Sequence, residues 1–144
     1  MKKFELTTDF IAPFGVKLFR IKALIEFGTV KAGELGGYIE KEENLSQKGD
    51  AWVCGNARVY GNAWVCGDAD YTTIKGFGTE CRNTTFFRCK DGSVKVACGC
   101  FLGTIDEFRK QVTETREGKI AKEYLMIADL MEYHFADSEV AENE

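Results

Sequence analysis

The chain of 144 residues is poor in several features that mark other classes of protein. It has one proline and one histidine, His134, and no hydrophobic run approaches the roughly 18 residues that a membrane-spanning helix requires. Its start reaches Glu5 before the apolar segment of a secretory signal could form. The length suits one or two small hydrophobic cores and not a multidomain enzyme. We therefore expect a soluble protein of the cytoplasm, without a membrane partner.

Recognisable catalytic motifs are also missing. The sequence contains no Gly-x-x-x-x-Gly-Lys phosphate loop, no paired-carboxylate motif and no Ser/His/Asp set. His134 falls near the end of a predicted terminal helix, where a lone histidine usually complements the helix dipole at the surface. We therefore expect no enzymatic activity and no cofactor.

The net charge of −4 is distributed unevenly along the chain. Residues 73–103 carry five Lys or Arg against two acidic residues, whereas residues 104–144 carry five basic residues against eleven acidic ones. General binding of duplex nucleic acid usually needs a broad positive surface, so this pattern argues against it. The pattern leaves room for a local anion site or for a charged protein partner.

An internal repeat is the strongest pattern in the sequence. Residues 49–72 form four six-residue units, each beginning with Gly-Asp or Gly-Asn, and a weaker form of the same pattern extends back to about residue 37. Valines alternate with small alanines and with outward residues inside the units, and the glycine pairs suit turns. The inward valines are Val53, Val59 and Val65. A short strand and a turn every six residues predict a β-solenoid over residues 37–72.

The repeat resembles the left-handed β-helix of the hexapeptide-repeat family. Together with residues 18–24, residues 33–46 and the Cys-Gly-Cys-Phe-Leu-Gly-Thr segment at residues 98–104, the chain is similar to small phage and prophage proteins. This resemblance implies a phage accessory protein that acts in the cytoplasm of a host cell, and it supplies no catalytic residues. Hexapeptide-repeat acyltransferases commonly use a histidine base, but His134 lies far from the repeat in sequence.

The remaining segments complete an α+β fold. We expect strands in residues 1–36 to cap the solenoid, a loop and hairpin over residues 73–103, a helical hairpin over residues 104–136 and an acidic tail at residues 137–144. Asp91-Gly92 predicts a two-residue turn that pairs Phe87 with Val96 and Thr85 with Cys98. Thr104 and Glu107 form a capping box that opens the first helix, with Gly118 as its expected end. The second helix is expected from about Lys119 to Phe135.

Four cysteines lie close together in the hairpin segment: Cys81, Cys89, Cys98 and Cys100. The predicted register places all four on one apolar face, where free cysteines pack as small hydrophobic residues. Their spacing lacks the pair of short Cys-x₂₋₄-Cys motifs that is typical of zinc sites. We therefore expect core packing and no metal.

Two groups of residues are candidates for binding. Trp52, Arg58 and Trp64 share an outward position in successive repeat units, and exposed tryptophans often contact a partner. The second face of the predicted hairpin combines basic side chains with an aromatic ring, which suits a nucleotide-like ligand. Its residues are Arg82, Thr84, Phe86, Arg88 and Lys95.

Three functions follow as hypotheses. The first is a counter-defence or host-modulating protein that docks on a host protein. The second is a small-ligand binder, such as a sponge for a nucleotide signal, and the third is a virion structural or assembly component. Because two solenoid coils would expose strand edges, we also expect a homo-oligomer, most simply a dimer or trimer.

Overall fold

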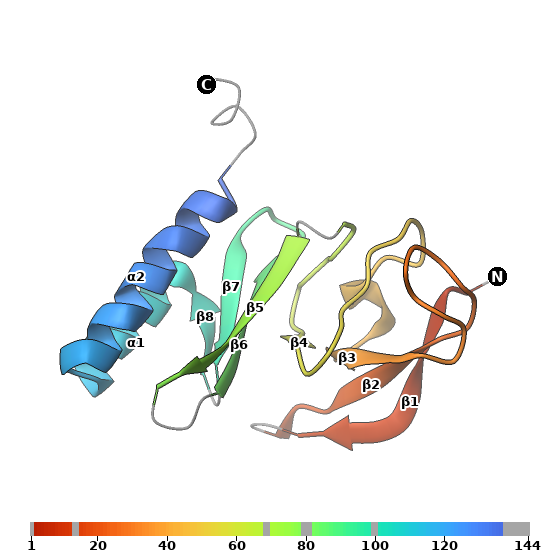
Figure 1. Cartoon of the computed structure of the whole chain (residues 1–144), viewed down its shortest axis with the longest axis horizontal. Coiled ribbons are helices and arrows are strands. Elements are labelled where there is room, and N and C mark those ends of the chain that lie inside the picture. Colours follow the sequence, from red (N-terminus) through yellow and green to blue (C-terminus); the bar gives the residue numbers. More distant parts are fainter. Residues whose placement is uncertain (1, 13–14, 68–69, 79–81, 99–100, 137–144) are drawn as a thin grey trace.

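The computed structural model describes residues 2–12, 15–67, 70–78, 82–98 and 101–136, and the predicted acidic tail lies outside them. The first sheet contains β1 (Phe4–Ile11), β2 (Leu18–Ala23), β3 (Leu35–Ile39) and β4 (Arg58–Val59), in that order. The second contains β5 (Tyr71–Phe77), β6 (Arg82–Arg88), β7 (Val94–Cys98) and β8 (Phe101–Thr104). Helices α1 (Ile105–Thr115) and α2 (Gly118–His134) follow. The helices, the second sheet and the first sheet lie side by side along the molecule (Figure 1).

The first sheet is antiparallel except at its last pair. β1 pairs with β2 and β2 with β3 in antiparallel register, whereas β3 and the short β4 are parallel. Alternation at the end of β2 turns Ile21 and Ala23 inward on either side of the exposed Lys22, and Leu18 at the start of the strand is also fully buried. Their core also includes Phe4, Ile39 and the valines of the repeat.

The predicted β-solenoid is wrong. Val53, Val59 and Val65 are fully buried as expected, but among the described residues β4 is the only named strand that lies wholly within residues 37–72, and it pairs with β3, which begins before them. The two open four-stranded sheets are not coils of a solenoid. A six-residue alternation specifies which side chains point inward, but it does not specify which segment covers them. Here the covering segments are β1, β2 and the second sheet, so the repeat acts as packed loops between two sheets.

The predicted hairpin is present, but its register is wrong by one residue. The Cys89 carbonyl accepts a hydrogen bond from the Gly92 amide (2.9 Å), and the Cys89 amide donates to the Ser93 carbonyl (2.8 Å). The loop between Cys89 and Ser93 therefore has three residues. Gly92 has a φ of 87°, which suits a type I turn followed by a left-handed residue. The observed pairs are therefore Phe86–Val96 and Thr84–Cys98. A one-residue shift turns each side chain of a strand toward the opposite face of the sheet, so it changes the predicted surroundings of every residue in β6.

The two C-terminal helices are confirmed. Thr104 Oγ1 accepts a hydrogen bond from the Glu107 amide (3.1 Å), and Glu107 Oε1 accepts one from the Thr104 amide (2.8 Å), which is the predicted capping box. Helix α1 is capped at Arg116, before the predicted position, and Gly118 opens α2 instead. The helices bury their apolar faces against the second sheet together with Phe86 and Val96. The second sheet is thereby covered on one face by helices and on the other by the repeat.

Candidate functional site

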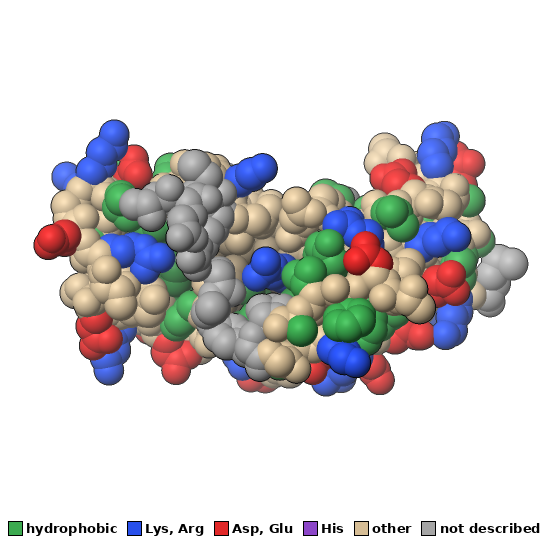
Figure 2. Space-filling view, turned by 90° about the horizontal axis from the view of Figure 1, so that it is seen from below, with side chains coloured by type: hydrophobic (Ala, Val, Ile, Leu, Met, Phe, Trp, Pro, Cys, Tyr) green, Lys and Arg blue, Asp and Glu red, His purple; other side chains and the backbone are tan. Residues whose placement is uncertain are grey.

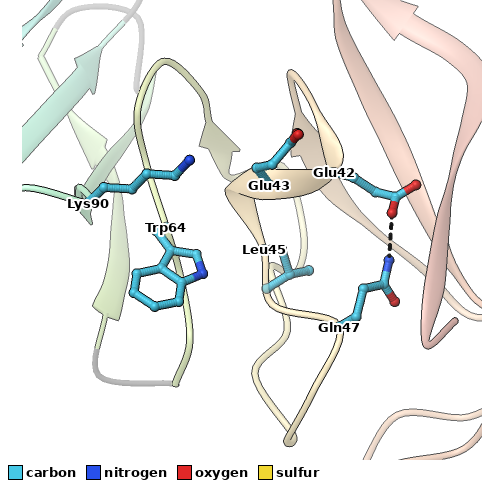
Figure 3. Close-up of a pocket in the computed structure, with 6 residues that line it drawn as sticks. All are labelled: Glu42, Glu43, Leu45, Gln47, Trp64 and Lys90. Atoms are coloured by element: carbon cyan, nitrogen blue, oxygen red, sulfur yellow. Dashed lines mark hydrogen bonds between the residues drawn. The ribbon is translucent and has the colours of Figure 1, made fainter.

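The best candidate for a binding site is a groove of about 560 Å³ beside the exposed indole of Trp64, called the Trp64 groove below. Figure 3 shows Lys90 extending beside the indole from one wall, while Glu43 comes from the short 3₁₀ helix Glu42–Asn44 on the other. Leu45 is almost fully buried and contributes to the lining between them. The full lining is Glu42, Glu43, Leu45, Gln47, Trp64 and Lys90.

The backbone of Trp64 is fixed on both sides. Its amide donates to the Arg88 carbonyl at the end of β6 (3.0 Å), and the next amide, that of Val65, donates to the Asn44 carbonyl (2.9 Å). The Lys90 amide donates to the Asn62 carbonyl (2.9 Å), which fastens the hairpin loop to the same segment. The indole is therefore presented from a rigid support although it is 49% exposed.

The buried side chain of Asn44 holds one wall of the groove against the repeat. Its Oδ1 accepts hydrogen bonds from the amides of Glu40 (3.1 Å) and Lys41 (3.0 Å). Its Nδ2 donates to the carbonyls of Gly61 and Ala63, both at 3.1 Å. All four hydrogen-bonding positions of the amide are satisfied, as a fully buried asparagine requires.

Gln47 and Glu42 form the outer part of the same wall. Gln47 Oε1 accepts from the amides of Lys3 (2.7 Å) and Phe4 (3.2 Å), which ties the groove to β1. Glu42 accepts from Lys2 Nζ at 2.7 Å and from Gln47 Nε2 at 3.4 Å (Figure 3). The hydrogen bond from Lys2 to Glu42 raises the pKa of the lysine.

Two charges in the groove have no ion-pair partner within the described part of the chain. They are the carboxylate of Glu43 on one wall and the ammonium group of Lys90 on the other. An exposed indole beside one free acid and one free base offers apolar contact area together with two directional charges. Such an arrangement suits a protein segment better than a small anion.

The predicted surface of Trp52, Arg58 and Trp64 does not form. Trp52 is 6% exposed, and its ring packs against Phe27 at a centroid distance of 5.4 Å. It also lies against Gly36, where a Cβ atom would approach the indole Cζ2 to 2.6 Å. Arg58 is half-buried in β4, and its amide donates to Thr85 Oγ1 (3.1 Å). Of the three residues, Trp64 is the one that lines the Trp64 groove.

The alternative nucleotide-binding face is covered in the structure. The register shift turns Thr84 and Phe86 toward the helices, where both are buried, and the Phe86 ring meets Phe108 edge-on. Arg88 is also engaged, since it pairs with Asp70 at 3.2 Å and donates to the Phe135 carbonyl at 3.2 Å.

The other two residues of the predicted nucleotide-binding face are Lys95 and Arg82. Lys95 lies opposite Phe87 and therefore on the other face of the sheet. The side chain of Arg82 lies outside the described residues.

The cysteines of the hairpin are divided between two cores. Cys89 packs in the core of the first sheet and Cys98 in the core of the helices, so the prediction that they share a face is wrong. Cys81 and Cys100 lie outside the described residues. Among the residues that the structure describes, no three metal-ligating side chains come together.

The sequence singles out Trp64 but not the charged residues beside it. Glu42, Glu43 and Lys90 reach the groove from segments that are distant in sequence, and no local pattern connects them with Trp64. The one available signal is the phase of the repeat, which places Leu45 at an inward position.

Comparisons with known proteins leave the family open. No protein-family model matches the chain, and neither the curated proteins nor the solved structures contain a significant match. The resemblance to phage proteins therefore stays an expectation from the sequence.

No helix in the described ranges has the length and apolar character needed to cross a membrane. On the face shown in Figure 2, acidic and basic side chains are interspersed at both ends of the molecule.

Proposed function

We propose that this chain is a non-enzymatic binding protein that docks on another protein through the Trp64 groove. The observation that carries the proposal is the half-exposed indole of Trp64 on a backbone that is fixed from both sides. Tryptophan is enriched among the residues that dominate binding energy at interfaces, and a rigid support lowers the entropy lost on binding.

The charges in the groove define the chemistry of the partner. A basic side chain of the partner would pair with Glu43 and an acidic one with Lys90, beside an apolar side chain that covers the indole. The resemblance to phage proteins supports a host protein as this partner and a host-modulating or counter-defence role. The nucleotide-sponge alternative is not pursued, because Thr84 and Phe86 are buried under the helices.

Affinity capture with matched variants tests the proposal. The tagged protein and its Trp64→Ala variant are incubated with a bacterial lysate, and the captured proteins are quantified by mass spectrometry. Tyr133→Ala is the control, because Tyr133 is 67% exposed on α2, away from the groove. We expect at least one protein that the parent and the Tyr133→Ala variant capture and that the Trp64→Ala variant loses.

The captured protein is then purified, and its affinity is measured directly. Removal of a central tryptophan from an interface costs about 2 kcal/mol or more of binding free energy, which raises the dissociation constant about 30-fold. Glu43→Lys and Lys90→Glu should each weaken binding at low salt. Equal affinity of the parent and the Trp64→Ala variant would show that the groove is not the docking site.

A further inference from the structure

A second groove, of about 590 Å³, lies between the loops of the first sheet and strand β5. Among the described residues, the two grooves have no lining residue in common. Thr72 and Thr73 of β5 form one side, and Glu34 and Asp50 belong to the loops on the other. Cys54 also lines it, and its amide donates to the Tyr71 hydroxyl at 3.0 Å, which fixes the repeat segment against the start of β5.

Strand β5 is an edge strand, and half of it is open. Within the described residues its neighbour in the sheet is β6, and its outer edge has no second strand. The far half carries features that block strand pairing: an irregular register after Ile74, the exposed Lys75, and Gly76 with a φ of 97°. The half that faces the groove, around Thr72 and Thr73, pairs regularly with β6 and has none of these features.

The groove is acidic. Glu34 and Asp50 are the charged side chains that line it among the described residues, and no lysine or arginine is present in the lining. Glu34 is held in place, because its Oε1 accepts a hydrogen bond from the Lys31 amide at 3.0 Å. The threonine hydroxyls of β5 add further acceptors. A ligand of this groove therefore gains from positive charge.

We infer that this groove binds an extended peptide segment that adds as a strand to the open half of β5 and places a lysine or arginine between Glu34 and Asp50. In such strand addition, main-chain hydrogen bonds to the edge supply affinity, and every second side chain of the peptide enters the neighbouring groove. The irregular half of β5 limits the added strand to the residues before Lys75.

Synthetic peptides test both parts of the inference. The probe is a fluorescein-labelled heptapeptide, Thr-Val-Lys-Val-Lys-Val-Thr, and binding to the full chain is followed by fluorescence anisotropy. One control peptide carries glutamate in place of lysine, and the other is N-methylated at alternate residues to remove main-chain donors. We expect the lysine peptide to bind and each control to bind at least about tenfold more weakly.

Amide hydrogen exchange measured by NMR locates the peptide. Amides of Thr72 to Ile74 that point away from β6 should exchange more slowly when the lysine peptide is bound. The double variant Glu34→Gln with Asp50→Asn should bind about tenfold more weakly, whereas Glu43→Gln in the Trp64 groove should bind normally. Circular dichroism shows whether the double variant is folded, and the peptide controls remain decisive if it is not.

Several outcomes would overturn the inference. They are an absence of binding at millimolar peptide, equal affinity for the N-methylated peptide, and equal affinity of the double variant in its folded state. Slower exchange of the β5 amides on concentrating the protein without peptide would overturn it as well, because a second copy of the chain would then occupy the edge.

Discussion

Replacing Asn44 by alanine should strongly destabilise the protein, although the residue is small and polar. The substitution leaves two amide donors, those of Glu40 and Lys41, and two carbonyl acceptors, those of Gly61 and Ala63, without their partner. A buried polar group without a partner costs about 1–3 kcal/mol. Only the hydrogen bond to the Ala63 carbonyl is fully buried, so water can replace Asn44 as the partner of some of the other three groups. We therefore expect the free energy of unfolding to fall by about 3–5 kcal/mol in total.

Asn44→Asp tests the acceptor and donor roles of this side chain separately, because aspartate keeps the accepting oxygen and loses the donating nitrogen. The carboxylate can still accept from the Glu40 and Lys41 amides, but its second oxygen faces the carbonyls of Gly61 and Ala63. Repulsion there should raise the pKa of the new carboxyl group in the folded state. The folded state then binds a proton more tightly than the unfolded state, so the deficit relative to the parent should shrink as the pH falls toward 4.

Urea unfolding, followed by tryptophan fluorescence and circular dichroism, measures the free energies of unfolding. Asn56→Ala is the control, because Asn56 occupies a repeat turn but is exposed, and its loss should change stability by about 0.5 kcal/mol or less. An Asn44→Ala variant within about 1 kcal/mol of the parent would refute the reasoning, since four hydrogen bonds would then contribute less than one usually does.

Two further predictions follow from burial. Val59→Asp should cost several kcal/mol in free energy of unfolding, because a carboxylate would enter a core where Val59 is fully inaccessible, and a variant with the melting temperature of the parent would contradict its inward position. At pH 8, iodoacetamide should modify the exposed Cys54 well before Cys89, since burial raises the pKa of the Cys89 thiol and blocks access to it. Peptide mass spectrometry over time gives both rates, and equal rates would show that Cys89 is accessible.

Local patterns predicted the helices because their determinants are local. Thr104 and Glu107 are three residues apart and satisfy each other, and the apolar stripe of α1 follows from helical spacing alone. The inward direction of Val53 and Val65 was predictable for the same reason, because alternation needs no knowledge of distant segments.

The predictions that were wrong, or that could not be made, share a different cause. Asp91-Gly92 is compatible with a two-residue or a three-residue hairpin loop, and the choice shifts the partner of Phe86 by one residue. The repeat phase is the same for Trp52 and Trp64, yet Trp52 is covered by Phe27 and Gly36 while Trp64 is exposed. Covering depends on contacts between distant segments, which a six-residue period does not encode. The charged walls of the Trp64 groove could not be predicted for the same reason.

Strand β6 belongs to both hydrophobic cores of the molecule at once. Phe87 contributes to the core beneath the first sheet, whereas its neighbour Phe86 contributes to the core beneath the helices. Loss of either core would leave one face of the same strand exposed to water and would remove the support of the other. The two halves should therefore melt together in a single cooperative transition, and the helices should not persist as a separately stable unit once the first sheet has unfolded.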